Sequence, residues 1–238
     1  MMDLYREPGL DIYEKVHYGS GDHRREVEDI LSWFHRGGAR VLDIGCSGGL
    51  HLLEFAAKGF HVTGIDIETS AIARADKRAK DLGLEIAFHV LDIARDSMAC
   101  LGTFDLIFSI GNVISHIDKT LMPEVLRKVW ACLDDDGVFV FDALAISAHF
   151  PVEVHELDLG IIWKRSLNRS TGEIRLEGIY RDFGITQDFR VWGYTADEMI
   201  AMLAQAGFRN TEFSDKLNFA YLETRSAAPV CLRFRTKH

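Results

Sequence analysis

Several features are missing from this 238-residue sequence, and each absence excludes a class of protein. No run approaches the roughly 18 consecutive apolar residues that a membrane-spanning helix needs. The net charge of −9 gives no cationic excess, which disfavours nucleic acid as a partner. The first residues, MMDLYREPG, have an early acid and no apolar core, so they predict no secretory signal. We therefore expect a cytoplasmic protein without a membrane segment.

Paired cysteines are also missing. The four cysteines, Cys46, Cys100, Cys132 and Cys231, are scattered and form no Cys-x-x-Cys pair. This spacing favours reduced thiols over a disulfide framework or a zinc site, and we expect no metal. A hydrophobic fraction of 47% and a charged fraction of 26% are typical of an ordinary globular protein.

Short apolar strands alternate with amphipathic helices between residues 40 and 142. The predicted strands are 40–44, 60–65, 85–91, 104–110 and 138–141. The predicted helices run from Leu50 to Gly59, from Thr69 or Ser70 to Gly83, and over 121–133 with Pro123 in the first turn. Continuous apolar strands separated by helices predict a parallel sheet that is covered on both faces.

The pattern changes to consecutive strands from about residue 152 to 193. Ile161–Trp163 and Glu173–Glu177 flank Asn168–Gly172, which predicts a hairpin. Thr195–Glu198 is a capping box that opens a helix ending at Gly207, and strands are expected at 208–213 and 230–234. We predict one α/β domain over 1–238. Its seven-stranded, doubly wound, mostly parallel, Rossmann-like sheet has helices on both faces and an antiparallel insertion at 152–193.

The stretch Val41-Leu-Asp-Ile-Gly-Cys-Ser-Gly-Gly-Leu-His51 places a glycine-rich turn after the first strand. Ligands of such sheets bind beyond the carboxyl ends of the strands. A dinucleotide fingerprint starting at Gly45 requires glycines where Ser47 and Leu50 stand, so that pattern is not met. Polar side chains lie at or near five strand ends: Asp43, Asp66, Asp92, Ser109 and Asp142.

The ordered motifs resemble those of the class I S-adenosylmethionine (SAM)-dependent methyltransferases. Asp43, Gly45 and Gly49 match the acid-x-Gly-x-Gly-x-Gly motif, with Ser47 in place of the middle glycine. Further matches follow in order: Val62–Ile67, Val90–Ile93, Phe104–Asn112, and Tyr194–Glu198 with Ala206–Phe208. The resemblance extends over about residues 12–215.

The resemblance implies SAM as cofactor and S-adenosylhomocysteine as product. Asp66 would accept hydrogen bonds from both ribose hydroxyls, Asp92 would meet the adenine amino group, and Ile93 would line the adenine face. The implied cofactor-binding residues are Tyr18, Asp43, Gly45, Cys46, Ser47, Gly49, Asp66, Ile67, Asp92, Ile93, Ser109 and Ile110. Alternatives remain open for three of these acids: Asp66 could cap a helix, Asp92 could form a loop turn, and Asp43 could brace the turn amides.

His116, in the loop after the fourth strand, is the candidate general base. If His116 acts in this way, the rate should rise with pH near the reference pKa of about 6.5, with an allowance of about one unit for the environment. Its alternative role is packing under the loop. His149 and His155 are further candidates of the same kind. Tyr13 and Tyr18 are expected ahead of the first amphipathic helix, in an N-terminal lid over 1–36 that could close on the cofactor-binding core at 37–142.

The sequence has no N-P-P-Y-like motif, no Pro-Cys pair for attack on a pyrimidine ring, and no carboxylate cluster for magnesium. The expected function is therefore in-line methyl transfer to an N or O atom of a small molecule gripped by the insertion and the N-terminal segment. The alternatives are a protein or RNA methyltransferase, a non-catalytic SAM-fold binding protein and an NAD(P)-dependent oxidoreductase. Assembly into a homodimer is also left open.

Overall fold

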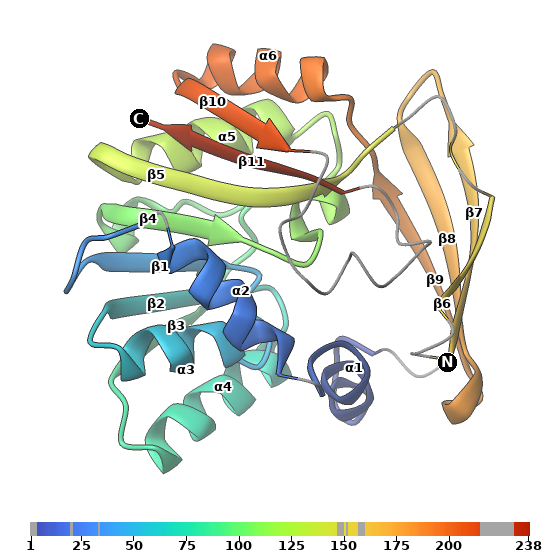
Figure 1. Cartoon of the computed structure of the whole chain (residues 1–238), viewed down its shortest axis with the longest axis horizontal. Helices are drawn as coiled ribbons and strands as arrows, with labels where there is room; N and C mark the ends of the chain where they lie inside the picture. Colours follow the sequence, from blue (N-terminus) through green and yellow to red (C-terminus); the bar gives the residue numbers. More distant parts are fainter. Residues whose placement is uncertain are drawn as a thin grey trace.

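The computed structural model describes residues 4–19, 21–32, 34–146, 150, 152–156, 160–214 and 231–238 (Figure 1). Its main sheet contains β1 (Arg40–Ile44), β2 (His61–Asp66), β3 (Ile86–Val90), β4 (Phe104–Ser109), β5 (Leu133–Leu144), β10 (Arg209–Ser214) and β11 (Cys231–Lys237). The order across the sheet is β10-β11-β5-β4-β1-β2-β3, and β11 runs antiparallel to both of its neighbours. The prediction of a doubly wound, mostly parallel sheet is confirmed.

Helices cover both faces of the main sheet. One face packs against α2 (Asp22–Leu31), α3 (Leu50–Ala57) and α4 (Thr69–Asp81), and the other against α5 (Met122–Ala131) and α6 (Ala196–Ala206). Phe55 and Phe108 are fully buried on the first face, and Val125 and Phe139 are fully buried on the second. Each such side chain contributes about 1.5–3 kcal/mol through the hydrophobic effect, which fixes the positions of the strand ends.

A second sheet stands beside the main one (Figure 1). It is antiparallel, with β6 (Glu153–Glu156), β7 (Ile161–Asn168), β8 (Glu173–Tyr180) and β9 (Ile185–Trp192) in sequence order. Helix α1 (Gly9–Tyr18) lies between the two sheets, where Ile12 and Val16 pack against Ile161 and Tyr180 of the second sheet. The second sheet and α1 thus enclose the carboxyl ends of the main strands.

Some predicted boundaries are wrong for local reasons. Leu133 is not the end of a helix but the first residue of β5, because it pairs with Phe104 of β4. Neither Thr69 nor Ser70 caps α4, whose N-cap is Glu68 without a side-chain cap. Tyr13 and Tyr18 lie within α1 and not ahead of it.

One of the two hydrogen bonds of the predicted capping box is present at the start of α6. Oγ1 of Thr195 accepts a hydrogen bond from the amide of Glu198 at 3.2 Å. The Glu198 carboxylate instead pairs with Lys119 Nζ at 2.7 Å, which joins α6 to the loop after β4. Within the described part of the chain, no helix is long and apolar enough to cross a membrane.

Candidate functional site

A cavity of about 590 Å³ lies at the carboxyl ends of the main strands. This volume is within the range of roughly 300–1,000 Å³ that small-molecule sites occupy. Most of the residues expected from the sequence line it: Tyr18, Asp43, Gly45, Cys46, Ser47, Asp66, Ile67, Asp92, Ile93, Ile110 and His116. The structure therefore brings the ends of β1, β2, β3 and β4 together around one space.

Ser109 and Gly49 do not belong to the cavity wall. Ser109 is fully buried, and its Oγ donates to the carbonyl of Ile44 at 2.9 Å. Gly49 has φ +78°, and a Cβ at this position would lie 2.9 Å from Cβ of Ala75. Ser109 joins β4 to the end of β1, and Gly49 allows α4 to pack closely against the glycine turn. Both residues therefore support the turn without lining the cavity.

Ser47 takes the left-handed backbone conformation, with φ +48°, where the motif has its middle glycine. A side chain in this conformation costs about 1–2 kcal/mol. Its amide donates to Asp66 Oδ2 at 2.8 Å, which helps to offset that cost. Gly48 has little room for any side chain, since a Cβ there would lie 2.1 Å from Glu14 Oε1.

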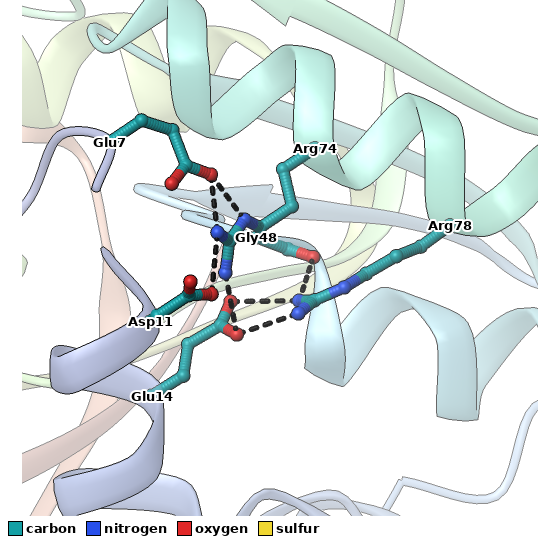
Figure 2. A network of polar contacts seen from close by, with 6 residues as sticks. All are labelled: Glu7, Asp11, Glu14, Gly48, Arg74 and Arg78. Atoms are coloured by element: carbon teal, nitrogen blue, oxygen red, sulfur yellow. Dashed lines mark hydrogen bonds and ion pairs between the residues drawn. The ribbon is translucent and has the colours of Figure 1, made fainter. Parts of the chain in front are cut away.

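Figure 2 shows the polar network that surrounds Gly48. Arg78 of α4 donates to Glu14 of α1 at 2.6 Å and to the carbonyl of Gly48 at 3.1 Å. Arg74 also reaches Glu14, at 3.2 Å, and pairs with Asp11 and Glu7. Helix α1 is thereby fastened to α4 across the glycine turn.

Sequence reasoning missed this network, although a signal was present. The acids at positions 7, 11 and 14 share one face at helical spacing, and the arginines at 74 and 78 are four residues apart. Because the two groups are about sixty residues apart along the chain, their pairing depends on the tertiary fold.

Asp66 stands at the end of β2 with both carboxylate oxygens in contact with backbone amides. Oδ2 accepts from Ser47, and Oδ1 accepts from Glu68 at 2.9 Å. Burial raises the pKa of Asp66, although these two amide hydrogen bonds oppose the shift. Each carboxylate oxygen has a second acceptor position, so the group retains capacity toward the cavity.

Asp92 forms the loop turn that was the alternative interpretation of this residue. Its Oδ1 accepts from the amide of Ala94 at 2.9 Å, and its amide donates to Asp96 Oδ2 at 2.9 Å. Asp92 nevertheless lines the cavity, beside Ile93, which is buried. The turn and a contact with a ligand are therefore compatible.

Asp43 is buried at the end of β1, and among the described residues nothing hydrogen-bonds to its Oδ2. Burial raises the pKa of Asp43 to about 7, and the nearby His51 charge opposes this shift. Buried acceptors in proteins nearly always have a partner. An unpartnered carboxylate oxygen in a cavity wall therefore indicates a site for a ligand donor.

His51 was not selected from the sequence, although it ends the stretch that contains the glycine turn. The residue is buried in the cavity wall, and its Nε2 lies 2.6 Å from Oε2 of Glu26 on α2. The Tyr18 ring packs edge-on against the His51 ring at 5.6 Å. The signal was a histidine in the first turn of the helix after the glycine turn.

His116 ends the short 3₁₀ helix η2 (Val113–His116) and faces the cavity. The rings of Tyr5 and Phe189 lie at 5.7 and 5.9 Å from its ring. Desolvation by the surrounding protein lowers the pKa of His116 to about 4. The ring remains open to the cavity, where water opposes desolvation, but the imidazole is neutral at pH 7. The direction of this shift makes the imidazole a weaker base than a free histidine, and the role of His116 as a general base stays a prediction.

The other histidine candidates lie elsewhere. His155 is on β6, where its Nε2 is 2.5 Å from Oε1 of Glu153, and it is not part of the cavity wall. His149 lies outside the described residues. Among the candidate histidines in the described ranges, His116 is thus the one that faces the cavity.

The wall opposite the glycine turn comes from β9 and from the loop after η2. Arg190 and Trp192 of β9 line it, with the guanidinium carbon 5.4 Å from the indole centroid. Asp118 adds a carboxylate on the same side. These polar groups come from the expected insertion and loop, but none was singled out from the sequence.

Two further kinds of chemistry were considered for this cavity, namely metal binding and nucleophilic attack by a thiol. In the part of the chain that the structure describes, no three His, Cys, Asp or Glu side chains are grouped to hold a metal ion. Burial raises the pKa of the Cys46 thiol, which disfavours the thiolate that a nucleophile requires. Cys46 is accordingly a small side chain that fills the turn.

Comparisons with known proteins show which proteins this chain is similar to. Residues 41–137 match the family described as a methyltransferase domain. A carboxy-S-adenosyl-L-methionine synthase from a Nitratiruptor species is 28% identical over 178 residues, which are 71% of this chain and 68% of that protein. A ubiquinone biosynthesis O-methyltransferase from Actinobacillus pleuropneumoniae serotype 7 is 32% identical over 111 residues, 45% of this chain and 46% of that protein.

Solved structures share the fold along nearly the whole chain. An amino pentose methyltransferase from Micromonospora echinaspora superposes with a TM-score of 0.72 at 21% identity, covering 95% of this chain and 97% of that chain. The CcbJ methyltransferase from Streptomyces caelestis gives a TM-score of 0.74 at 14% identity and covers 99% of both chains.

The sheet order, the cavity beyond its strand ends and the matched domain together define a methyltransferase of the Rossmann-like class. Residues 41–137 are thus a methyltransferase domain, and the motifs along the chain are similar to those of the class I SAM-dependent methyltransferases.

Proposed function

We propose that this protein transfers the methyl group of SAM to an N or O atom of a small-molecule acceptor. The observation that carries the proposal is the single cavity that joins the glycine turn and Asp66 to His116 and Arg190. The groups proposed for the methyl donor and those proposed for the methyl acceptor thus line one cavity. Two reactants can be aligned only if they bind in the same space.

The residues present fit the donor. Asp66 has acceptor capacity toward the cavity for a ribose diol, and Asp92 and Ile93 border the adjoining wall for adenine. The unpartnered Oδ2 of Asp43 suits an ammonium group at the other end. SAM, when bound, supplies a methyl group on a sulfonium, which is already a good leaving group.

The remaining wall would position the acceptor. His116 is neutral at pH 7, so it can accept a proton from an acceptor that arrives protonated. The rings of Tyr5 and Phe189 lie beside the His116 ring and give this side of the cavity apolar surface. Alignment and water exclusion are the main tasks of the protein here, because methyl transfer asks little covalent chemistry of it.

Ligand binding tests the first half of the proposal. S-adenosylhomocysteine at about 100 times its Kd should stabilise the fold by about 2.7 kcal/mol. For a chain of this size the corresponding rise in Tm is roughly 5–11 °C. NAD at the same concentration should give no shift. An unchanged Tm with S-adenosylhomocysteine, or a clear shift with NAD, contradicts the proposal.

Transfer from methyl-labelled SAM to panels of amines, alcohols, phenols and carboxylic acids tests the second half. Label in a small-molecule product with wild-type protein, reduced in Asp66→Ala, supports the proposal. Label only in added protein or RNA would favour the macromolecular alternative. Mass spectrometry of the nucleoside products in the same incubations detects a carboxylated SAM, the compound for which the Nitratiruptor relative is named.

A further inference from the structure

Two arginines of the described chain line the cavity, and they differ in their partners. Arg95 pairs with Asp92, with 3.5 Å between its Nε and Oδ2 of the acid. Arg190 of β9 is exposed, and no carboxylate among the described residues forms an ion pair or a hydrogen bond with its guanidinium. The chain has 36 acidic residues against 27 basic ones, so carboxylates are plentiful. An arginine without one in a cavity wall indicates a site for an anion from outside the chain.

The acid that lies nearest to this role is Asp118, which lines the same part of the cavity. Its Oδ1 accepts hydrogen bonds from Thr120, at 2.7 Å from the hydroxyl and at 2.9 Å from the amide. These hydrogen bonds lower the pKa of Asp118, and the charge of Arg190 adds a smaller effect in the same direction. Asp118 is therefore held in its own loop turn, and it acts on Arg190 through its charge without pairing with it.

The guanidinium of Arg190 is supported by an aromatic ring. Its central carbon lies 5.4 Å from the centroid of the indole of Trp192, which is buried and also lines the cavity. Such a cation–π contact is attractive, but the ring face does not take the place of hydrogen-bond acceptors for the five N–H groups. An arginine presents these groups as a planar fork that matches the oxygens of a carboxylate or a phosphate. Arg190 is thus suited to bind an oxyanion.

The residue before Arg190 connects it to the candidate general base. The ring of Phe189 lies 5.9 Å from the ring of His116 and 5.6 Å from the ring of Tyr5. Adjacent residues of a strand are only about 3.3 Å apart along its axis. A small molecule with an anionic group at Arg190 can therefore lie along these rings, with its other end beside His116.

We propose that the methyl acceptor is an anionic small molecule, and that Arg190 binds its carboxylate or phosphate group while the accepting N or O atom lies beside His116. This inference rests on the proposed function, because it assumes that methyl transfer takes place in this cavity. Arg190 is then a substrate-binding residue that selects acceptors by their charge.

Matched acceptors test the inference in the assay with methyl-labelled SAM. The members of each set share one aromatic, aliphatic or sugar framework with an amine or a hydroxyl group. They differ in having a carboxylate, its neutral methyl ester or a phosphate monoester. Wild-type protein should methylate an anionic member with a kcat/KM about 10-fold above that of the ester. This is the lower end of the range for a hydrogen bond to a charged group, about 10- to 150-fold, because Arg190 is exposed. The better of the two anionic members identifies the group that Arg190 binds.

Variants at the cavity wall should change this preference in opposite directions. In Arg190→Gln it should fall to within about threefold, through a higher KM for the anionic acceptor, with the rate on the neutral ester nearly unchanged. Arg190→Lys retains the charge without the planar fork and should retain part of the preference. Asp118→Asn should increase the preference, because it removes a negative charge near the bound anion.

Arg175→Gln is the matched control. Arg175 is the register partner of Arg190 on β8, is exposed, pairs with Glu173 at 3.3 Å and does not line the cavity. This variant removes the same charge from the same sheet and should keep the wild-type preference. A loss of preference in Arg175→Gln equal to that in Arg190→Gln would overturn the inference, since the effect would then come from the general charge of the sheet.

Other outcomes separate this inference from the proposed function. If wild-type protein methylates small molecules but shows no preference for the anionic members, or if Arg190→Gln retains that preference, the inference is overturned and the proposed function stands. A methyl ester of the anionic group as the product also overturns it, because that group is then the acceptor itself. If S-adenosylhomocysteine does not bind and no small molecule is labelled, the proposed function fails and the inference fails with it.

Discussion

The guanidinium of Arg78 donates both to the carboxylate of Glu14 and to the carbonyl of Gly48 (Figure 2). One side chain therefore joins the N-terminal helix to the glycine turn. Glu14 is itself part of the cavity wall. The position of α1 over the cavity and the shape of the turn should consequently depend on the same ion pair.

Arg78→Met should weaken S-adenosylhomocysteine binding by about 5- to 30-fold, equivalent to about 1–2 kcal/mol for a partly buried charged hydrogen bond. Hydrogen exchange of the α1 amides should accelerate in the variant, because the helix then keeps only the Arg74 contacts with α4 in this network. Lys77→Met is the control, since Lys77 is exposed and pairs with Asp81 on the same helix. Wild-type exchange rates for α1 in Arg78→Met would contradict the prediction.

Asp66→Ala should weaken binding of S-adenosylhomocysteine by about 10- to 150-fold if the carboxylate accepts hydrogen bonds from the ribose. The same change removes the acceptor for the amides of Ser47 and Glu68, so the fold must be checked separately. Asp66→Asn keeps one acceptor oxygen and should lose less affinity. If calorimetry finds unchanged affinity in both variants and their Tm is normal, Asp66 does not bind the ribose. Its role is then limited to the hydrogen bonds at the start of α4.

Local patterns in the sequence predicted the main sheet well. Apolar runs separated by helical stripes place β1 to β4 and α3 to α5 close to their observed bounds, because burial on both faces demands that composition. β5 is longer than its predicted 138–141. The chain also takes a left-handed conformation at Ser47, where the motif has a glycine, so the turn survives the substitution. The strand and helix bounds depend on neighbours in the sequence, whereas the positive φ of Ser47 was not predicted from it.

The missed parts of the site depend on neighbours in space. Glu14 meets Arg78 across 64 positions, and Glu26 meets His51 across 25. Neither pair has a local spacing that identifies its partner. The low pKa of His116 likewise results from the protein atoms around it, which come from the N-terminal segment and β9. Composition and periodicity can place such residues on one face of a helix, but they do not identify the partners that the fold brings to them.

Asp43 should make the stability of the ligand-free protein depend on pH. Its pKa is about 7 in the folded chain, above the unfolded reference of about 3.9, with His51, Asp66 and Glu26 as the charged neighbours that modify it. The folded state retains the proton between these values, so this contribution to stability is present at low pH and is lost as pH rises to about 7. Asp43→Asn cannot ionise at this position, so its stability should not fall in this way as the pH rises to about 7.

The Tm of Asp43→Asn relative to wild type should therefore rise between about pH 4 and 7 and level off above that. Differential scanning calorimetry in matched buffers measures this difference. Asp188→Asn, at an exposed position of β9, should show no such trend. S-adenosylhomocysteine should stabilise wild type more than Asp43→Asn, because its ammonium favours the ionised carboxylate. A Tm difference that does not vary with pH would contradict the assignment.

His116→Ala should lower kcat by about 10²–10⁴ if the imidazole removes a proton from the acceptor. Affinity for S-adenosylhomocysteine should stay nearly unchanged, because no contact ties His116 to the donor-side groups among the described residues. A pKa of His116 below that of free histidine moves the rising limb of its contribution below about pH 6.5, and it also makes the imidazole a weaker base. Any rise in rate between about pH 6 and 9 then reports ionisation of an amine acceptor and should persist in the mutant. Steady-state rates across this range, with Phe189→Leu as a control for the apolar packing around the ring, separate the two contributions. If His116→Ala keeps its turnover within a few-fold, the residue serves packing, and catalysis in this cavity consists of alignment and exclusion of water.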